Sequence, residues 1–392
     1  MKYRLSERRI SFGSGISASI DVDWSNSQFS DIVRLLDRHR PHVVSIRCSV
    51  PVKSHLLLVR ALFHSALTDF ELRMVHGPGH LPFEDFIVPL CKTFGSEMTG
   101  MGHKTEKGVM ISRYRIRRNL PSHPHPIGFY VMTNGKDIAK LDATLKTIAD
   151  QSIPNADIAV VGPAALREHP LIQEKYSGTR VIPDEGIYSS DKRMPLSRKK
   201  NLVFNEIRAE RLVILHDRIR LGPGFAKRLL ETSPWFDLYT CRLTASGTHR
   251  YLDKFGVRFD SYYNLRKRHY YLDYREDNID QQIDGGFFVL HARALQGDRF
   301  DDRLHWGEME DLDFVLRRKL EFNLVTFDPG NQVESLFTNH FSLKEGSPLR
   351  TYYKSRVRRW KLGYWIVRGI ARARVWKTRR LGTTLQSGRP RT

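Results

Sequence analysis

Cysteines are few in this sequence and form no motif. Cys48, Cys91 and Cys241 lie far apart without a CxxC spacing, which argues against a structural zinc site and a disulfide framework. No run of 18 apolar residues occurs, so we expect no helix that spans a membrane. The first residues lack the apolar stretch of a signal peptide. We therefore expect a cytoplasmic protein.

Several nucleotide-binding signatures are also missing. No GxGxxG follows the first strand of the predicted second domain, and no GxxxxGK[ST] occurs, so neither a dinucleotide site nor a P-loop is supported. RNA-recognition, KH, zinc-finger and helix-turn-helix patterns are absent as well. A nucleic-acid-binding protein remains an alternative because of the Arg- and Tyr-rich stretch 262–274, but we expect no nucleic-acid partner.

Acidic residues are absent after Glu345, while Lys and Arg continue to the end. The 392-residue chain carries a formal net charge of +21, a field that attracts phosphorylated substrates and anionic surfaces. Residues 349–392 interleave these cations with Trp and Tyr, a pattern typical of a helix that lies on a membrane surface. We interpret this segment as a basic aromatic helical tail that anchors the protein on the inner face of a membrane. A helix packed on the catalytic domain is the alternative.

The length of the chain favours two domains. Residues 1–122 read as a small N-terminal α/β domain of unknown role, without a catalytic constellation. Segment 98–126 is basic and rich in Gly, His and Pro, which marks a boundary. From residue 123 to 348 strands and helices alternate, which predicts a second α/β domain with a mostly parallel sheet. Its strands are expected at 127–132, 157–162, 179–184 and 212–215, and its helices at 137–151 and 195–209.

One predicted strand ends abruptly in polar residues. Leu212 to Leu215 form an apolar run, and His216, Asp217 and Arg218 follow at once. Open α/β sheets bind ligands at the carboxyl ends of their strands. Asp217 is therefore expected at a crevice, where its carboxylate can bind a hard cation; a solvated turn is the alternative.

A second acidic cluster, residues 306–314, contains Glu308, Glu310, Asp311 and Asp313 directly after Trp306-Gly307. The cluster begins a predicted helix that ends in Arg317-Arg318-Lys319. Acidic residues at the start of a helix and basic ones at its end suit the helix dipole. That structural explanation accounts for some of the carboxylates, but it does not explain the Trp-Gly pair before them.

These pieces resemble the motifs of a known family in order and spacing. The resemblance is to nucleotide-sugar glycosyltransferases of the GT-A fold, most similar to glycosyltransferase family 2, and covers about residues 125–345. It is carried by Thr133-Asn134-Gly135 with the following helix, by Leu196-Ser197-Arg198-Lys199-Lys200-Asn201, by Val213-Ile214-Leu215-His216-Asp217-Arg218, and by Gly285-Gly286-Phe287 with Trp306-Gly307-Glu308-Met309-Glu310-Asp311-Leu312-Asp313-Phe314.

The resemblance implies an inverting transfer of a sugar from a nucleoside-diphosphate sugar to a hydroxyl of a glycan or lipid-linked acceptor, in surface-polysaccharide or glycolipid synthesis. It implies a divalent cation, Mn²⁺ or Mg²⁺, which shares its shell with substrate phosphates. The implied roles are catalytic for Asp311 as the base and for Glu310; donor-binding for Thr133, Asn134, Asp184, Lys200, Asn201, His216 and Arg218; acceptor-binding for Gly285, Gly286, Trp306 and Glu308; and metal-binding for Asp217 and His340.

The sequence departs from the family at two of these positions. The DxD motif keeps one carboxylate, Asp217, so that His216 or Arg218 would have to supplement the metal or replace it as a fixed charge. The second strand ends in Gly162-Pro163 where the family carries an Asp for the base. Asp184 or Glu185 is then the candidate for the base or ribose. The missing second Asp also leaves open a GT-A-like scaffold without catalysis.

Overall fold

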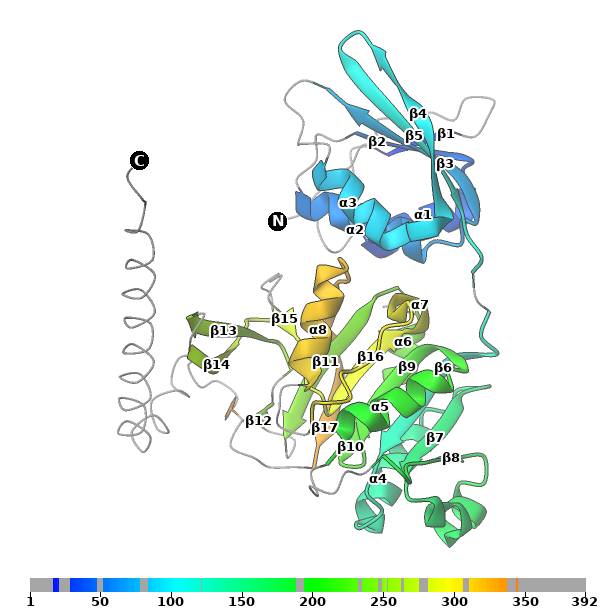
Figure 1. Cartoon of the computed structure of the whole chain (residues 1–392). Helices are drawn as coiled ribbons and strands as arrows, with labels where there is room; N and C mark the ends of the chain where they lie inside the picture. The colour runs from blue at the N-terminus through cyan, green and yellow to red at the C-terminus, as the bar shows by residue number, and fades with distance from the viewer. Residues whose placement is uncertain are drawn as a thin grey trace, which may run out of the picture.

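The computed structural model describes residues 17–20, 29–47, 52–77, 84–120, 122–187, 194–231, 235–245, 249–251, 253–261, 264–274, 281–305, 310–336 and 343–344. Within them the chain folds around two large sheets, each with its own apolar core (Figure 1). Among these residues, none of the helices is long and apolar enough to cross a membrane.

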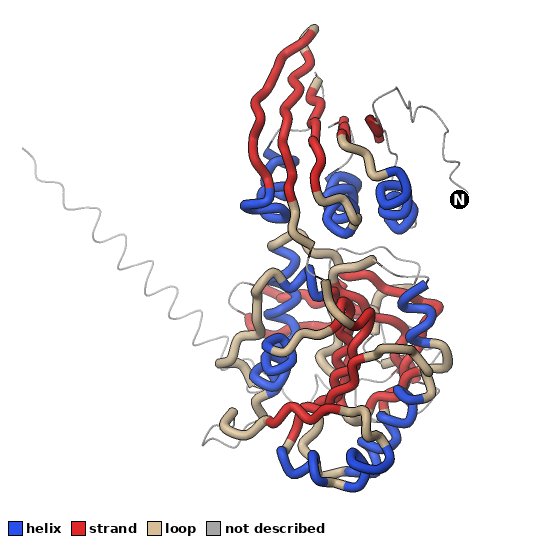
Figure 2. The backbone as a smooth tube through the Cα atoms, turned by 90° about the vertical axis from the view of Figure 1, so that its right-hand side faces the viewer, coloured by secondary structure: helices blue, strands red, loops and turns tan. Residues whose placement is uncertain are grey.

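The first sheet is five-stranded, in the order β1-β2-β3-β5-β4. Strands β1 to β3 are parallel, and β5 returns antiparallel beside β3. Three helices lie on one side of the sheet, between it and the rest of the protein (Figures 1 and 2). The elements are β1 (Ser17–Ile20), α1 (Phe29–His39), β2 (Val43–Arg47), α2 (Val52–His64), β3 (Asp69–His76), α3 (Glu84–Phe94), β4 (Met98–Glu106) and β5 (Val109–Arg117).

Strands β4 and β5 occupy most of the segment 98–126 that we expected to be a boundary. Apolar residues there are sparse but well placed, because Ile116 is fully buried against the helices while its neighbours on the strand point away. Ser112 is also buried, and the remaining side chains of the hairpin, including its basic ones, are at least partly exposed.

The second sheet has ten strands and runs β10-β17-β11-β16-β9-β6-β7-β8, with β12 paired to β11 and β18 paired to β12. Along this path only β16 and β10 run against the other strands, so the predicted mostly parallel α/β sheet is confirmed. The strands are β6 (His125–Met132), β7 (Asp157–Gly162), β8 (Arg180–Pro183), β9 (Ala209–His216), β10 (Ile219–Leu221), β11 (Leu238–Ala245), β12 (His249–Arg250), β16 (Phe287–His291), β17 (Val325–Ser335) and β18 (Leu343–Lys344).

Helices cover both faces of this sheet, and an apolar core fills each face. The helices are α4 (Ile138–Ala149), α5 (Leu196–Asn205), α6 (Phe225–Glu231), α7 (Ala292–Leu295) and α8 (Glu310–Leu320). A separate three-stranded sheet contains β13 (Phe255–Ser261), β14 (Asn264–Tyr271) and β15 (Gln281–Gln282). Helix α5 is shorter than the predicted 195–209, because Ala209 already pairs with His125 as the first residue of β9.

The strand order brings the candidate residues to one edge. Strands β6, β8 and β9 end directly before Thr133, Asp184 and Asp217. Strand β16 runs in the opposite direction and starts beside the end of β9, where Phe287 pairs with Leu215. Gly286 and Gly285, which precede β16, therefore reach the carboxyl edge of the parallel strands, the usual ligand-binding edge of such sheets.

The N-terminal helices pack against the opposite edge of the large sheet. Asp237 directly precedes β11, and its carboxylate accepts hydrogen bonds from Arg60 (Nε to Oδ2, 2.9 Å), from Nε2 of His64 (2.8 Å) and from the backbone of Leu324 (2.9 Å). Arg60 and Asp237 are fully buried. We call Arg60, His64 and Asp237 the interface cluster, because two of its members come from α2 and one from the large sheet.

Candidate functional site

Asp217 is held at the sheet edge by the residue that follows β6. The hydroxyl of Thr133 donates to Oδ2 of Asp217 at 2.6 Å and accepts the N–H of Gly135 at 3.0 Å. Burial raises the pKa of Asp217, against the opposing effects of the Thr133 hydrogen bond and of Arg218. Thr133 therefore orients this carboxylate and stabilises its charged form.

Lys199 lies on the same side, although the sequence pointed to its neighbour. Its ammonium group is 2.5 Å from the carbonyl oxygen of Thr133 and 2.5 Å from Oδ2 of Asp184. Asp184 is only 1% exposed. The carboxylate that we expected to contact the donor base or ribose thus lies inside the protein, against a lysine that sequence reasoning missed.

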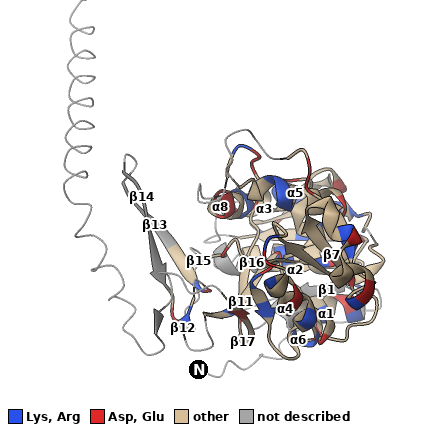
Figure 3. Ribbon diagram, turned by 90° about the horizontal axis from the view of Figure 1, so that it is seen from below, with Lys and Arg blue, Asp and Glu red and all other residues tan. Residues whose placement is uncertain are grey.

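Lys200 points the other way, toward α8. Consecutive helical residues are rotated by about 100°, so Lys199 and Lys200 on α5 face different neighbours. Nζ of Lys200 is fully buried, lies 3.6 Å from Oε1 of Glu310 and has no hydrogen-bond partner among the described residues. The rings of Phe288 and Phe300 lie 5.7 and 4.7 Å from it. Figure 3 shows the basic α5 near the acidic start of α8. The lysine that we expected to bind the donor therefore lies beside the predicted catalytic pair.

Glu310 and Asp311 begin α8 and face the glycine turn before β16. Oδ2 of Asp311 accepts the N–H of Gly285 at 3.1 Å. A Cβ atom on Gly285 would lie 3.1 Å from the same oxygen and 3.2 Å from Nζ of Lys200, so this position is closely packed by both charged groups. Burial raises the pKa of Glu310, and Lys200 opposes that shift. The structure thus brings together the two predicted catalytic carboxylates and one of the predicted acceptor glycines.

Asp284 adds a third carboxylate that the sequence analysis did not select. Its Oδ1 accepts the N–H of Gly286 at 2.8 Å. Burial and the neighbouring Asp311 raise the pKa of Asp284 to about 6. The available signal was its place directly before Gly285-Gly286, but an Asp before a glycine pair is also an ordinary turn residue.

His216 marks a basic region beside this turn. Its backbone N–H donates to the carbonyl of Gly286 at 3.0 Å, and its buried Nε2 has no hydrogen-bond partner in the described ranges of the chain. Burial lowers the pKa of His216 well below its usual value, with further lowering by Arg218, Lys200 and Lys199. A neutral imidazole with three cations around it suits an anionic ligand.

Two predicted donor residues use their side chains within the protein. Oδ1 of Asn134 accepts the N–H of Lys136 at 2.9 Å in the turn after β6. The amide of Asn201 donates to the carbonyl of Phe300 (2.9 Å) and to Asp302 (2.6 Å), and its oxygen accepts the N–H of Phe300 (2.9 Å). These contacts hold segment 300–302 against α5, in contrast to the donor contact that we expected from Asn201.

Three predicted site residues, Trp306, Glu308 and His340, lie outside the described residues, as does the tail 349–392. Among the residues that are described, no group of three or more His, Cys, Asp or Glu could hold a metal ion. The cations around His216 disfavour a metal there, whereas the Asp217 carboxylate suits one. One protein carboxylate with substrate phosphates is an ordinary ligand set for Mg²⁺, so the residues present fit an ion bound together with its substrate.

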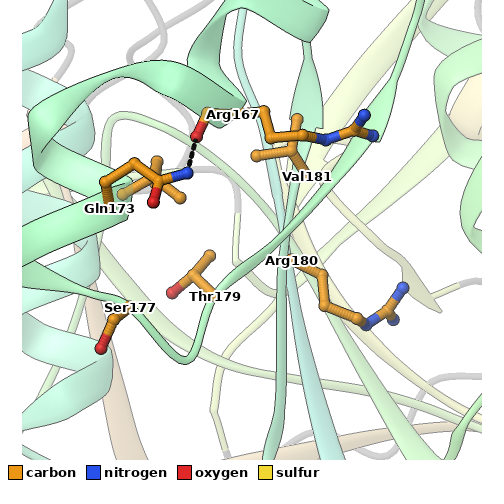
Figure 4. A pocket seen from close by; sticks show the side chains of 7 residues that line it. Arg167, Gln173, Ser177, Thr179, Arg180 and Val181 are labelled. Carbon is orange, nitrogen blue, oxygen red and sulfur yellow. Dashed lines mark hydrogen bonds between the residues drawn. The ribbon is translucent and has the colours of Figure 1, made fainter.

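A pocket of about 370 Å³ lies beside β8, away from these residues (Figure 4). It is lined by Arg167, Ile172, Gln173, Ser177, Thr179, Arg180 and Val181. The amide of Gln173 donates to the carbonyl of Arg167 at 2.6 Å, and Arg180 pairs with Asp157 at 2.7 Å. None of the predicted site residues lines this pocket.

Comparison with known proteins finds only a distant likeness to some solved structures. No family model and no curated protein matches it. Solved structures that resemble it include S. aureus TarS 1–349 (TM-score 0.38, 13% identity, 54% of this chain and 60% of that one), the same fragment with UDP (0.38, 14%, 55% and 61%), and GalNAc-T7 with UDP, GalNAc and Mn²⁺ (0.40, 12%, 57% and 45%). The chain spans less than two thirds of each of these proteins. The chemistry must therefore be inferred from its own residues.

Proposed function

We propose that this protein transfers a sugar from a nucleoside-diphosphate sugar to a hydroxyl acceptor, with inversion at the anomeric carbon. One observation carries the proposal: the two glycines of Gly285-Gly286 lie beside different charged groups. A Cβ atom on Gly286 would lie 3.7 Å from both Arg218 and His216, which we call the basic side. The N–H of Gly285 donates to Asp311 on the acidic side, where Glu310 lies 3.6 Å from Lys200. Such a reaction needs both a diphosphate site and a base.

The basic side suits the leaving diphosphate. Lys199 and Arg218 supply positive charge near His216, whose uncharged ring can donate or accept a hydrogen bond without repelling cations. Asp217 is the residue that would hold a divalent ion, which stabilises the charge on the leaving group when bound. Asp184 and Thr133 keep Lys199 in place, and Asn201 holds the adjacent segment. Their contribution to donor binding is then indirect.

The acidic side suits the acceptor. As the acceptor oxygen forms its bond to the anomeric carbon, the bond from that carbon to the diphosphate breaks, and the diphosphate leaves with the electron pair. The acceptor proton passes to the carboxylate of Asp311, which the N–H of Gly285 orients. Glu310 and Lys200 keep the surrounding charge balanced. One base without a nucleophile on the opposite face gives a single displacement, and hence inversion.

The test is calorimetric binding of several nucleoside diphosphates, and release of diphosphate from their sugars, with and without Mn²⁺. Asp217→Asn should abolish release and leave the melting temperature nearly unchanged. Asp142→Asn, which removes a half-buried carboxylate of α4 that pairs with Lys175, should keep wild-type activity. Diphosphate binding without turnover under any condition would favour a non-catalytic scaffold, and absence of binding would refute the proposed function.

The acceptor is proposed to be a glycan or a lipid-linked glycan at an anionic membrane surface, as in polysaccharide or glycolipid synthesis. The support is the basic and aromatic composition of residues 349–392, since each Lys or Arg near an anionic bilayer contributes roughly 1 kcal/mol. Liposome flotation of the full chain should increase with anionic lipid and decrease with salt. Equal flotation of a chain ending at Ser347 would contradict the anchor.

A further inference from the structure

Two carboxylates are fastened to consecutive backbone N–H groups of one turn. Asp311 accepts the N–H of Gly285 at 3.1 Å, and Asp284 accepts the N–H of Gly286 at 2.8 Å. Asp311 comes from the start of α8, whereas Asp284 directly precedes the turn. The glycine pair therefore joins a predicted catalytic carboxylate to a second carboxylate with no assigned role.

The turn leaves both carboxylates little room. A Cβ atom on Gly285 would lie 3.1 Å from Oδ2 of Asp311, and one on Gly286 would lie 2.8 Å from Oδ1 of Asp284. The second distance is shorter than real Cβ contacts. Glycine at both positions thus allows the two acids to lie directly against the backbone.

We propose that Asp284 is a positioning residue for Asp311: it keeps a second negative charge beside that carboxylate on the shared turn, and so makes Asp311 a stronger base for the acceptor proton. This inference rests on the proposed function. Asp284 acts through Asp311 and the turn, without touching the reacting atoms.

The surroundings of Asp284 agree with this role. The charged groups that face it are Asp311 from α8, Arg218 from the end of β9 and Lys200 from α5. Glu310 shares Lys200 with them. Two carboxylates that share a site disfavour each other's ionisation, and the pKa of Asp284 is accordingly raised to about 6, with burial as the larger cause. Removal of the Asp284 charge therefore takes away the like charge that faces Asp311.

The experiment measures diphosphate release from a nucleotide sugar that the wild type hydrolyses, with water as acceptor, between pH 4.5 and 9. Asp284→Asn keeps an oxygen for the N–H of Gly286 but loses the charge. Its acid limb should move to lower pH, because the carboxyl group with a pKa of about 6 is gone, and its plateau kcat should fall about tenfold with the weaker base. KM for the donor should stay within about twofold, because the change acts on the base.

Two further variants separate charge from structure. Asp313→Asn removes a carboxylate two residues from Asp311 that faces Arg317 at 3.0 Å instead of the turn, and its acid limb should match the wild type. Asp284→Ala loses both the charge and the turn hydrogen bond. If Asp284→Asn has the wild-type pH profile and only Asp284→Ala loses activity, the carboxylate merely supports the turn and the proposal is overturned.

A stability measurement gives an independent readout. A carboxyl group whose folded pKa is about 6 destabilises the fold as pH rises from about 4 to 6, because the unfolded group ionises first. The melting temperature of Asp284→Asn minus that of the wild type should therefore rise over that pH range. The same difference, measured between Asp311→Asn with and without Asp284→Asn, should rise less. A difference that does not change with pH overturns the proposal. A wild type that neither binds diphosphates nor hydrolyses nucleotide sugars overturns the proposed function, and with it any catalytic role of the pair.

Discussion

The interface cluster and the candidate site are both buried groups of charges, but they are satisfied to different degrees. Asp237 accepts hydrogen bonds from Arg60, His64 and the backbone. In the site, Nζ of Lys200 is buried and has no hydrogen-bond partner within the part of the chain that the structure describes. A buried unsatisfied polar atom lowers stability by about 1–3 kcal/mol, so a protein retains such an atom where its function gains from it.

The pKa values separate the two regions in the same way. Burial by itself would raise the pKa of Asp237, but Arg60 and His64 outweigh it and hold that pKa far below the usual range. Burial raises the pKa of Asp284, Glu310 and Asp217, and their cationic neighbours do not cancel it. Fully paired charges join two parts of a structure, whereas incompletely paired charges suit a site that a charged substrate completes.

The largest predicted effect is on the interface cluster. Arg60→Met leaves Asp237 buried without its cation, and removal of one partner of a buried ion pair costs about 3–5 kcal/mol. Urea unfolding should show this loss. Arg60→Met with Asp237→Asn should recover part of it, because no buried charge is then left unpaired. A loss below about 1 kcal/mol in the single variant would mean that the pair does not join the two parts.

The next effect is on catalysis. Asp311→Asn should lower kcat by about 10²–10⁴-fold, the typical contribution of a general base, while diphosphate affinity measured by calorimetry stays unchanged. Asp313→Asn on the same helix serves as the control. Collapse of donor affinity with turnover intact would move Asp311 out of the base role.

A pH effect should follow from His64. Burial lowers its pKa to about 4, against about 6.5 in the unfolded chain. A group with a lowered pKa stabilises the fold fully above the unfolded value and loses that contribution as pH falls toward the folded value. The free energy of unfolding of the wild type should therefore fall by about 3 kcal/mol between pH 6.5 and 4 because of His64. His64→Gln should remove this part of the pH dependence. Parallel stability curves for both proteins would contradict the burial of a neutral His64.

The smallest stability effect is expected at Lys200. Lys200→Met removes a buried ammonium group for which the described residues offer no hydrogen bond. The stability gained because no ammonium is buried and the stability lost with the Glu310 ion pair should cancel within about 1 kcal/mol. Activity should nevertheless fall, because Glu310 loses its counter-charge. A destabilisation as large as that of Arg60→Met would place Lys200 among the structural charges, and the contrast between the two regions would fail.

Local patterns in the sequence were sufficient for the strands that build the site. Continuous apolar runs predicted β6, β7 and β9, since strands buried on both faces carry no alternation. Polar residues at their ends placed Thr133 and Asp217 at one edge. The hairpin of β4 and β5 was not predicted although a two-residue turn, Lys107-Gly108, joins its strands, because β4 has no buried side chain and so shows no apolar alternation.

What the sequence by itself determined is the alternation of strands and helices, and the presence of acids after strand ends and at a helix start. Only the tertiary structure decided which charges meet. The antiparallel return of β16 brings Asp284 and its glycines to the end of β9, and the rotation of α5 turns Lys199 toward Asp184 and Lys200 toward Glu310. Pairing depends on distance and burial between segments remote in sequence, because the strength of a charge interaction is set by the surrounding medium, and neither quantity can be read from the order of residues.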